Sequence, residues 1–277
     1  DFQSIYYLGW AILILSMAFK VSVAPMHFWA PDVYDGTPTV FSSYMITIVK
    51  GAAFLAFITV LGSFKITAEY VGENYRYLLS FMIILTLILG NFSAMKQRSV
   101  KRMLAYSSVV QAGFMMFALF SISESSKNAL LFYTVSYGLS SIVLFYALTR
   151  TMNHNHKGFT GLAKNSPLLA ASCSIALFSL AGIPFTSGFL GKFFILSSAM
   201  EDPNNLLLVI FALVMAVVSI YYYIKVIRVM YFKKTKNRRK IKLSSTTRFL
   251  LIVGSALNIL LGVYPDALWN FLALFSA

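Results

Sequence analysis

The sequence predicts an all-α polytopic membrane protein with about eight transmembrane helices, which form one membrane domain over residues 1–277. Hydrophobic residues make up 58% of the chain and charged residues only 12%, whereas about 25% of the residues in a soluble domain are charged. Each helical crossing needs about 20 apolar residues, so the chain has room for about eight spans and short loops. The alternating ten-residue segments of a β-barrel are absent, which leaves helices to satisfy the backbone in lipid.

The spans follow one another as apolar runs separated by polar breaks. They are expected near 5–24, 38–62, 77–95, 99–122, 128–150, 167–200, 205–231 and 248–275. Lys and Arg gather in the loops after the third, fifth and seventh spans, and the last of these is a basic loop at about 232–247. Because basic loops face the cytoplasm or the matrix, residues 25–37 are expected on that same side and both chain ends on the other.

Several classes of function are excluded by composition and motif. The net charge of +14 follows from the basic loops, so we expect contact with lipid head groups and no nucleic acid. A single cysteine, Cys173, excludes a disulfide framework and a cysteine-ligated iron–sulfur cluster built from this chain alone. His154 and His156 lack a third metal ligand. No phosphate-binding loop, carboxylate pair or nucleophile–base arrangement occurs, so we expect no metal and no cofactor in this chain.

Two spans contain proline where a continuous helix would not tolerate it. Pro25 lies near the end of the first span, and Gly182 and Pro184 lie in the middle of the sixth. Each proline removes a backbone hydrogen bond and clashes with the preceding turn. The sequence therefore predicts two broken helices, which either are simple kinks or mark an ion or substrate site, as paired broken helices do in transporters.

Three lysines fall within or beside these apolar spans. Lys50 is about twelve residues, or about 18 Å, from either end of its span, too far for its side chain to reach water. Lys192 is about eight residues, or about 12 Å, from the end of its span. Lys20 precedes Pro25 by five residues, and there its side chain either is buried or reaches the head groups.

A lysine held in apolar surroundings is suited to proton transfer. Desolvation disfavours the charged form, so the ammonium releases its proton more readily than it does in water. No acidic residue lies inside the predicted spans that carry the three lysines, so none is there to neutralise them. His27, just past Pro25, is either a proton shuttle or a cap for free carbonyls. The other polar side chains of the spans either hydrate a proton path or hold helices together: Tyr106, Ser107, Ser108, Tyr133 and Tyr137.

Three stretches carry a resemblance to a known family. They read FKVSVAPMHFWAPDVYDGTPTVFSSYMITIVKGAAF, NFSAMKQRSVKRMLAYSSVVQAGF and LFSLAGIPFTSGFLGKFFIL. In order and spacing the chain resembles antiporter-like subunit 2, also called subunit N, of respiratory complex I, the proton-pumping NADH:quinone oxidoreductase. The wording PDVYDGTP, and Lys50 followed by Gly–Ala–Ala–Phe, are more similar to subunit 2 than to subunits 4 and 5.

The resemblance implies roles for the three lysines. Lys20 would be the channel lysine on the first broken helix, Lys50 the connecting lysine, and Lys192 the terminal lysine on the second broken helix. The family also has a glutamate on an earlier helix, paired with the lysine that matches Lys20. This chain has no such helix, so it is expected to be the C-terminal part of the subunit, with an upstream segment or a separate chain supplying the missing helices and the glutamate.

By the same resemblance, the expected function is proton translocation in complex I, driven by redox chemistry in other subunits. NADH, FMN, iron–sulfur clusters and quinone are expected there, and neighbouring antiporter-like subunits are expected partners. The expected location is the mitochondrial inner membrane or a bacterial plasma membrane. Two alternatives remain: a subunit of a cation/proton antiporter or membrane-bound hydrogenase, and a scaffold remnant that conducts no protons.

Overall fold

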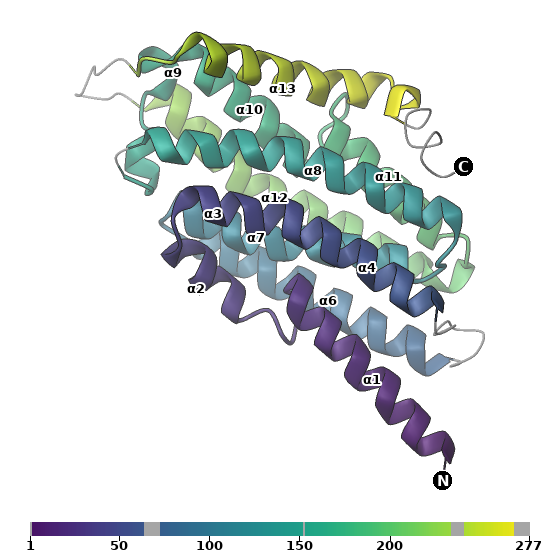
Figure 1. The fold of residues 1–277 in the computed structure, drawn as a ribbon. Coiled ribbons are helices and arrows are strands. Elements are labelled where there is room, and N and C mark those ends of the chain that lie inside the picture. The colour runs from purple at the N-terminus through teal and green to yellow at the C-terminus, as the bar shows by residue number, and fades with distance from the viewer. Residues whose placement is uncertain (1, 64–72, 152, 234–240, 269–277) are drawn as a thin grey trace.

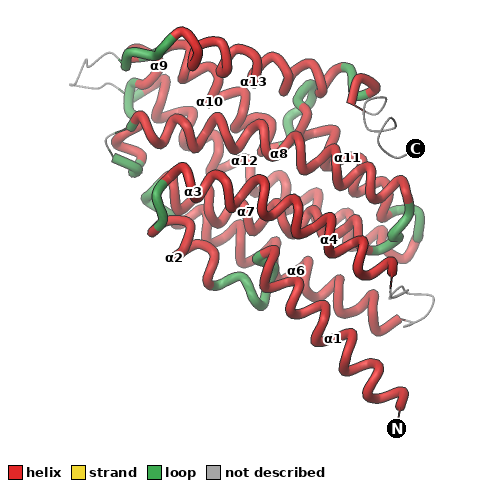
Figure 2. Tube along the Cα trace, in the orientation of Figure 1, coloured by secondary structure: helices red, strands yellow, loops and turns green. Residues whose placement is uncertain are grey.

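The protein is a bundle of roughly aligned helices joined by short loops (Figure 1, Figure 2). A computed structural model describes residues 2–63, 73–151, 153–233 and 241–268. In these residues the extended structure is limited to one isolated bridge between Ser99 and Asn155. The α-helices are α1 (Phe2–Val21), α2 (Trp29–Gly36), α3 (Thr39–Tyr44), α4 (Lys50–Ser63), α6 (Glu73–Lys96), α7 (Val100–Met115), α8 (Glu124–Arg150), α9 (Leu162–Asn165), α10 (Pro167–Ala181), α11 (Ser187–Ala199), α12 (Leu206–Phe232) and α13 (Ser245–Val263).

The helices confirm the predicted membrane class. Among the described residues, five helical stretches are long and apolar enough to cross a membrane: Thr39–Ser63, Asn74–Lys96, Glu124–Arg150, Pro203–Phe232 and Ser245–Val263. Two shorter apolar helices, Ile5–Val21 and Pro167–Ala181, accompany them. The last predicted span, 248–275, is interrupted after Val263, where α13 ends, because Pro265 cannot donate the next helical hydrogen bond. Residues 269–275 of that span lie outside the described residues. Residues 234–240 of the predicted basic loop lie outside the described residues.

Both predicted helix breaks are present. The first separates α1, which ends at Val21, from α2, which begins at Trp29. The second separates α10 from α11, and here Gly182 takes a left-handed conformation with φ of +81°. The amides of Gly182 and Ile183 both donate to the carbonyl of Phe178, which closes the helix in the manner of a Schellman motif.

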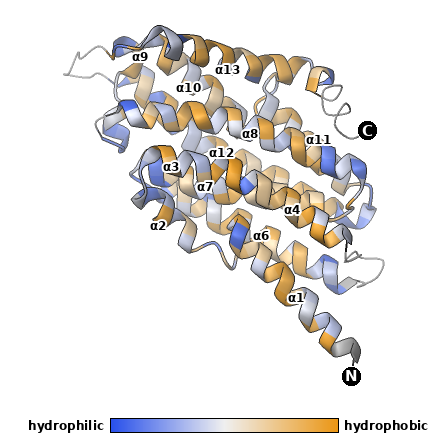
Figure 3. Ribbon diagram, viewed as in Figure 1, coloured by the Kyte–Doolittle hydropathy of each residue, from blue (hydrophilic) through white to orange (hydrophobic). Residues whose placement is uncertain are grey.

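Hydrophilic residues gather mainly at the two ends of the bundle (Figure 3), and the ion pairs of the described residues lie there. At one end, the Arg102 guanidinium donates to the Asp32 carboxylate at 2.6 Å, and the Lys101 ammonium donates to the Asp35 carbonyl at 2.7 Å. This confirms that residues 25–37 share an end with the basic turn between α6 and α7. At the other end, Arg76 pairs with Asp202.

Candidate functional site

Lys50 is buried in the middle of the bundle, as its depth in the span predicts. Its side chain is 1% exposed. The Nζ atom donates to the carbonyl of Ser108 on α7 at 2.9 Å and to the hydroxyl of Ser108 at 3.2 Å, and it lies 5.7 Å from the ring centroid of Tyr34. Among the described residues no carboxylate pairs with it. The ammonium is therefore held by dipoles and a π-face instead of by a counter-charge.

The turn before Lys50 is irregular. Residues Met45–Val49 form a π-helical turn between α3 and α4, and Lys50 is the first residue after it. Such turns are rare and occur often at functional sites. The sequence analysis did not predict this turn, because the apolar run from 38 to 62 reads as one regular helix.

Lys192 is joined to the second helix break. It is 6% exposed, and its Nζ donates to the carbonyl of Leu180 at 2.8 Å and to that of Ala181 at 3.2 Å. In a continuous helix the Leu180 carbonyl would accept from residue 184, which is Pro184 and has no N–H. The lysine thus takes the place of a backbone donor at the negative end of α10. Its Nζ also lies 4.8 Å from the ring centroid of Phe114.

A row of buried polar side chains extends from the Leu180 carbonyl, which Lys192 contacts, into the centre of the bundle. The side-chain amide of Gln111, on α7, donates to the same Leu180 carbonyl at 3.1 Å and to the hydroxyl of Tyr223, on α12, at 3.1 Å. The hydroxyl of Tyr133 donates to the oxygen of that amide. The hydroxyls of Ser107 and Tyr223 are hydrogen-bonded to each other. Both N–H donors and the oxygen of the Gln111 amide are therefore engaged inside the bundle.

Tyr137 lies between this row and Lys50. It is on α8, one turn from Tyr133, with its hydroxyl near Ser141 and Ser108, and its electrostatic neighbours are Tyr34 and Tyr223. Ser108 in turn holds the Lys50 ammonium. Buried residues thus lie all the way from one lysine to the other. Hydrogen bonds join Lys50 to Ser108 at one end, and Tyr223, Gln111, the Leu180 carbonyl and Lys192 at the other, while Tyr137 stands between the two groups and is near Tyr223 by electrostatic interaction alone.

Four of the five polar residues suggested from the sequence lie in or beside this row, and Tyr106 does not. Sequence reasoning missed two members, Gln111 and Tyr223. Gln111 could have been found, since it is an amide inside an apolar run, and polar side chains in spans are functional or adhesive. Tyr223 could not, because it stands in a run of three tyrosines and only packing selects one of them.

Lys20 and His27 lie outside the row. Lys20 is exposed in the last turn of α1, and among the described residues it has no hydrogen bond or ion pair. His27 is half-buried, with its Nδ1 atom unpartnered in the described part of the chain. The structure thus gathers two of the four predicted proton-transfer residues and leaves two apart.

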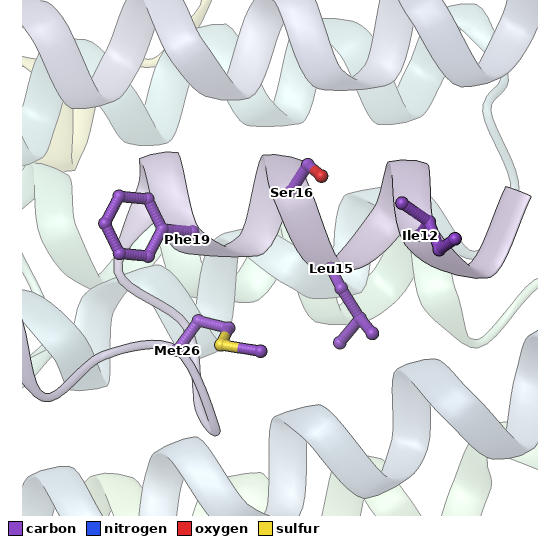
Figure 4. A pocket seen from close by; sticks show the side chains of 5 residues that line it. All are labelled: Ile12, Leu15, Ser16, Phe19 and Met26. Carbon is purple, nitrogen blue, oxygen red and sulfur yellow. The ribbon is translucent and has the colours of Figure 1, made fainter. Parts of the chain in front are cut away.

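The outer side of α1 carries a groove of about 360 Å³. Figure 4 shows its lining, which comes from α1 and the chain just after it: Ile12, Leu15, Ser16, Phe19 and Met26. Ile12 and Phe19 are 55% and 48% exposed. An apolar helix face that is open in this way is shaped to contact either lipid or another helix.

Comparison with known proteins gives one consistent similarity. Residues 3–219 match a profile described as NADH:quinone oxidoreductase/Mrp antiporter, transmembrane. NADH-quinone oxidoreductase subunit N of Cytophaga hutchinsonii is 37% identical over 270 residues, which is 95% of this chain and 58% of that protein. The chain spans about half the length of the curated relatives it matches, from 58% of the Cytophaga hutchinsonii protein to 49% of subunit N of Bdellovibrio bacteriovorus.

Solved structures share the fold. A chain of respiratory complex I from Thermus thermophilus, determined with bound aureothin, superposes with a TM-score of 0.79 at 29% identity and covers 92% of this chain and 56% of its own. A chain of the membrane-bound sulfane sulfur reductase, an archaeal respiratory membrane complex, gives a TM-score of 0.84 at 29% identity, covering 94% and 53%. The helix order described above is therefore that of a subunit found in more than one respiratory assembly.

Proposed function

Because the chain belongs to the NADH:quinone oxidoreductase/Mrp antiporter transmembrane family, we propose that it conducts protons as part of a complex I subunit. In this proposal Lys50 and Lys192 are the proton-carrying groups, and redox chemistry takes place in other subunits. The observation that carries the proposal is the buried row between the two lysines, neither of which has a carboxylate partner among the described residues.

The way in which each lysine is held favours proton exchange. Carbonyl dipoles and aromatic faces stabilise an ammonium, but less strongly than a carboxylate would, and burial disfavours its charge. Each lysine can therefore take up or release a proton without an ion pair being separated. The hydroxyls of Ser108, Tyr137 and Tyr223 each donate and accept, which is what a side chain needs in order to pass a proton along a row.

Two neighbouring positions in the row, the Gln111 amide and the Leu180 carbonyl, cannot carry a proton as they stand. The Gln111 nitrogen donates to both the Tyr223 hydroxyl and the Leu180 carbonyl and accepts from neither. The Leu180 carbonyl only accepts, and both Gln111 and Lys192 donate to it. Transfer to Lys192 therefore requires water molecules beside these two positions or a rotation of the Lys192 side chain. Together the two positions separate the row into two segments and are suited to act as a controlled step.

Lys20 belongs to the proposal through the family resemblance. Its exposure and the open groove on the same helix support the prediction that helices outside this chain pack on α1 and supply a glutamate beside Lys20. An opposite charge at that place would hold Lys20 protonated, and moving it away would release the proton. His27 is proposed as a shuttle near this break.

The remaining predictions complete the proposal. NADH, FMN, iron–sulfur clusters and quinone would be bound by partner subunits, and other membrane subunits of the complex, including antiporter-like ones, would flank this chain. The location would be the mitochondrial inner membrane or a bacterial plasma membrane. Similar curated proteins from Cytophaga hutchinsonii, Desulforamulus reducens and Moorella thermoacetica are each named NADH-quinone oxidoreductase subunit N. These names support a complex I subunit over an antiporter or hydrogenase subunit.

The test is Lys192→Met in the complete complex, reconstituted in liposomes. Electron transfer and proton translocation are measured separately in these liposomes. We expect translocation per electron to fall about tenfold or more, because a methionine can neither hold nor pass a proton. Lys127→Met is the control, since Lys127 pairs with Glu124 at the surface. Assembly should be unchanged in both variants.

Full translocation by both Lys192→Met and Lys50→Met complexes would contradict the relay and favour the scaffold alternative. The antiporter and hydrogenase alternatives are separated by purification. A complex I subunit should purify with flavin and iron–sulfur subunits that oxidise NADH, whereas an antiporter subunit should purify with membrane proteins only.

A further inference from the structure

A cavity of about 320 Å³ lies between α11 and α12 and reaches Lys192. Ligand sites in proteins start at about 300 Å³, so the space is sufficient for a small amphiphile. Its walls are apolar over most of their extent and include Phe193 and Leu196 on α11 and Leu213 and Val217 on α12. Phe193 is 55% exposed and Val217 is 66% exposed, so the cavity borders the outer surface of the described chain.

The inner end of the cavity differs from its walls. Gly182 and Lys192 both line it, and a Cβ atom on Gly182 would come within 3.4 Å of the Lys192 Nζ. The absence of a side chain at Gly182 therefore leaves the ammonium uncovered on that side. Of the residues described around the cavity, Lys192 is the ionisable one, and its polar partners are the carbonyls of Leu180 and Ala181.

Those two carbonyls leave the ammonium incompletely satisfied. An ammonium has three donors, and here two of them have acceptors while the Phe114 ring lies near the group. A buried positive charge without an anion is costly. An anionic group entering the cavity would complete the donor set and neutralise the charge.

We propose that this cavity binds a long-chain carboxylic acid, with its carboxylate at Lys192 and its tail between α11 and α12. The cavity matches such an acid in charge and in shape. The Lys192 ammonium at its inner end would pair with the carboxylate, and the apolar slot that opens on the outer surface would hold the tail. A phospholipid fits less well, because its phosphate would have to leave the membrane interface to reach a residue inside the span. A protonated acid is uncharged, so it can enter through the apolar walls.

Binding includes one balanced proton transfer when Lys192 is neutral. The carboxylic acid gives its proton to the amine, which leaves a carboxylate beside an ammonium, and no other reactant is needed. The bound anion would hold Lys192 in its charged form and so inhibit proton release. Binding itself is independent of the proposed function, whereas this inhibition rests on it.

Binding is tested by photolabelling of the complete complex in its membrane, using a palmitic acid analogue with a diazirine in its tail. Labelled peptides should come from 189–200 and 209–220, and unlabelled palmitate should compete. Val217→Trp, which fills the cavity, should reduce labelling about tenfold or more, and Leu213→Trp should do the same as a second filling variant.

Val214→Trp is the matched control, because Val214 lies on the same helix and is 55% exposed but does not line the cavity. Its labelling should equal that of the unchanged protein. The diazirine methyl ester should label at least about tenfold less than the acid, since losing one member of a buried charge pair exceeds the 1.4 kcal/mol that tenfold represents. Equal labelling by acid and ester, or no loss in either filling variant, would overturn the proposal.

A transport measurement separates binding from its effect. Palmitate should lower proton translocation per electron in the unchanged complex and in Val214→Trp but not in Val217→Trp. Specific labelling without this inhibition would leave the binding site standing and contradict the role of Lys192 in proton release. Inhibition that persists in Val217→Trp would instead place the effect of palmitate elsewhere and overturn the regulatory part.

Discussion

Both broken helices are interrupted by a proline, but the surroundings of the two breaks differ. In the first, Pro25 stands four residues after Val21, and in the second, Pro184 stands four residues after Leu180. Each proline therefore removes the donor that a helix would supply to that carbonyl. The Leu180 carbonyl receives two side-chain donors, from Gln111 and Lys192. For the carbonyl of Val21, the described residues show no donor.

The surroundings of the two lysines differ in the same way. Lys192 is buried against α7 and α10, and its partners among the described residues belong to this chain. Lys20 faces outward from α1, which is the helix at the edge of the bundle that carries the N-terminus (Figure 1). The comparison teaches that a helix break alone does not make a site. The second break is the stronger candidate site, because a cation and an amide converge on its free carbonyl.

A hydroxyl stabilises each break. The amide of Ala24 donates to the Thr86 hydroxyl at 2.9 Å, and the amide of Gly188 donates to the Ser179 hydroxyl at 3.1 Å. Thr86 comes from α6, whereas Ser179 belongs to α10 itself. The first break is therefore fixed by a neighbouring helix, and the second closes on itself.

The largest expected difference in stability is between alanine substitutions in the two broken helices, at Gly188 just after the second break and at Gly9 in the first half of α1. A Cβ on Gly188 would collide with the Ser179 carbonyl, which is backbone and cannot move aside, whereas a Cβ on Gly9 of α1 meets nothing within 4 Å. We expect Gly188→Ala to destabilise the folded protein by about 3 kcal/mol, and Gly9→Ala to leave stability unchanged or higher. The measurement is the Tm of the purified protein in detergent, and equal values for the two variants would contradict the close contact of Gly188 with the Ser179 carbonyl.

A smaller effect is expected when the link from the second break to Lys50 is cut. Gln111→Leu removes three hydrogen bonds and leaves the Tyr133 hydroxyl without its partner, so stability should fall by about 2 kcal/mol. Under the proposed function, proton translocation per electron should fall as well. Gln97→Leu is the control, since Gln97 makes one bond to the Ser93 carbonyl near the end of α6. Unchanged translocation in Gln111→Leu would remove this residue from the path.

The smallest effect is expected at the first break. Thr86→Val removes the acceptor for the buried amide of Ala24, which should cost about 1 kcal/mol. Ser179→Ala removes the corresponding acceptor at the second break and should cost a similar amount. Both values are measurable as shifts of Tm in detergent. A much larger loss in Thr86→Val would mean that the first break depends on α6 more than the second depends on its own serine.

Much of the bundle could be predicted because the bilayer makes local sequence informative. A helix must satisfy its own backbone in lipid, so apolar length and proline position set the spans and both breaks. Lys50 and Lys192 could be singled out by depth alone. The end of α13 at Val263 could not be predicted in the same way. Apolar residues continue past Pro265, so hydropathy alone extends the span beyond the proline that ends the helix.

The sequence by itself determined the membrane class, the order of the spans, the two breaks and the two deep lysines, since each depends on residues close together in the chain. Only the tertiary structure decided what holds those lysines. Ser108 is 58 residues from Lys50, and the Gln111 amide meets the carbonyl of Leu180 at a separation of 69 residues. Such long-range contacts depend on how the helices pack against one another. The same packing determines that Lys20 faces outward whereas Lys192 is buried.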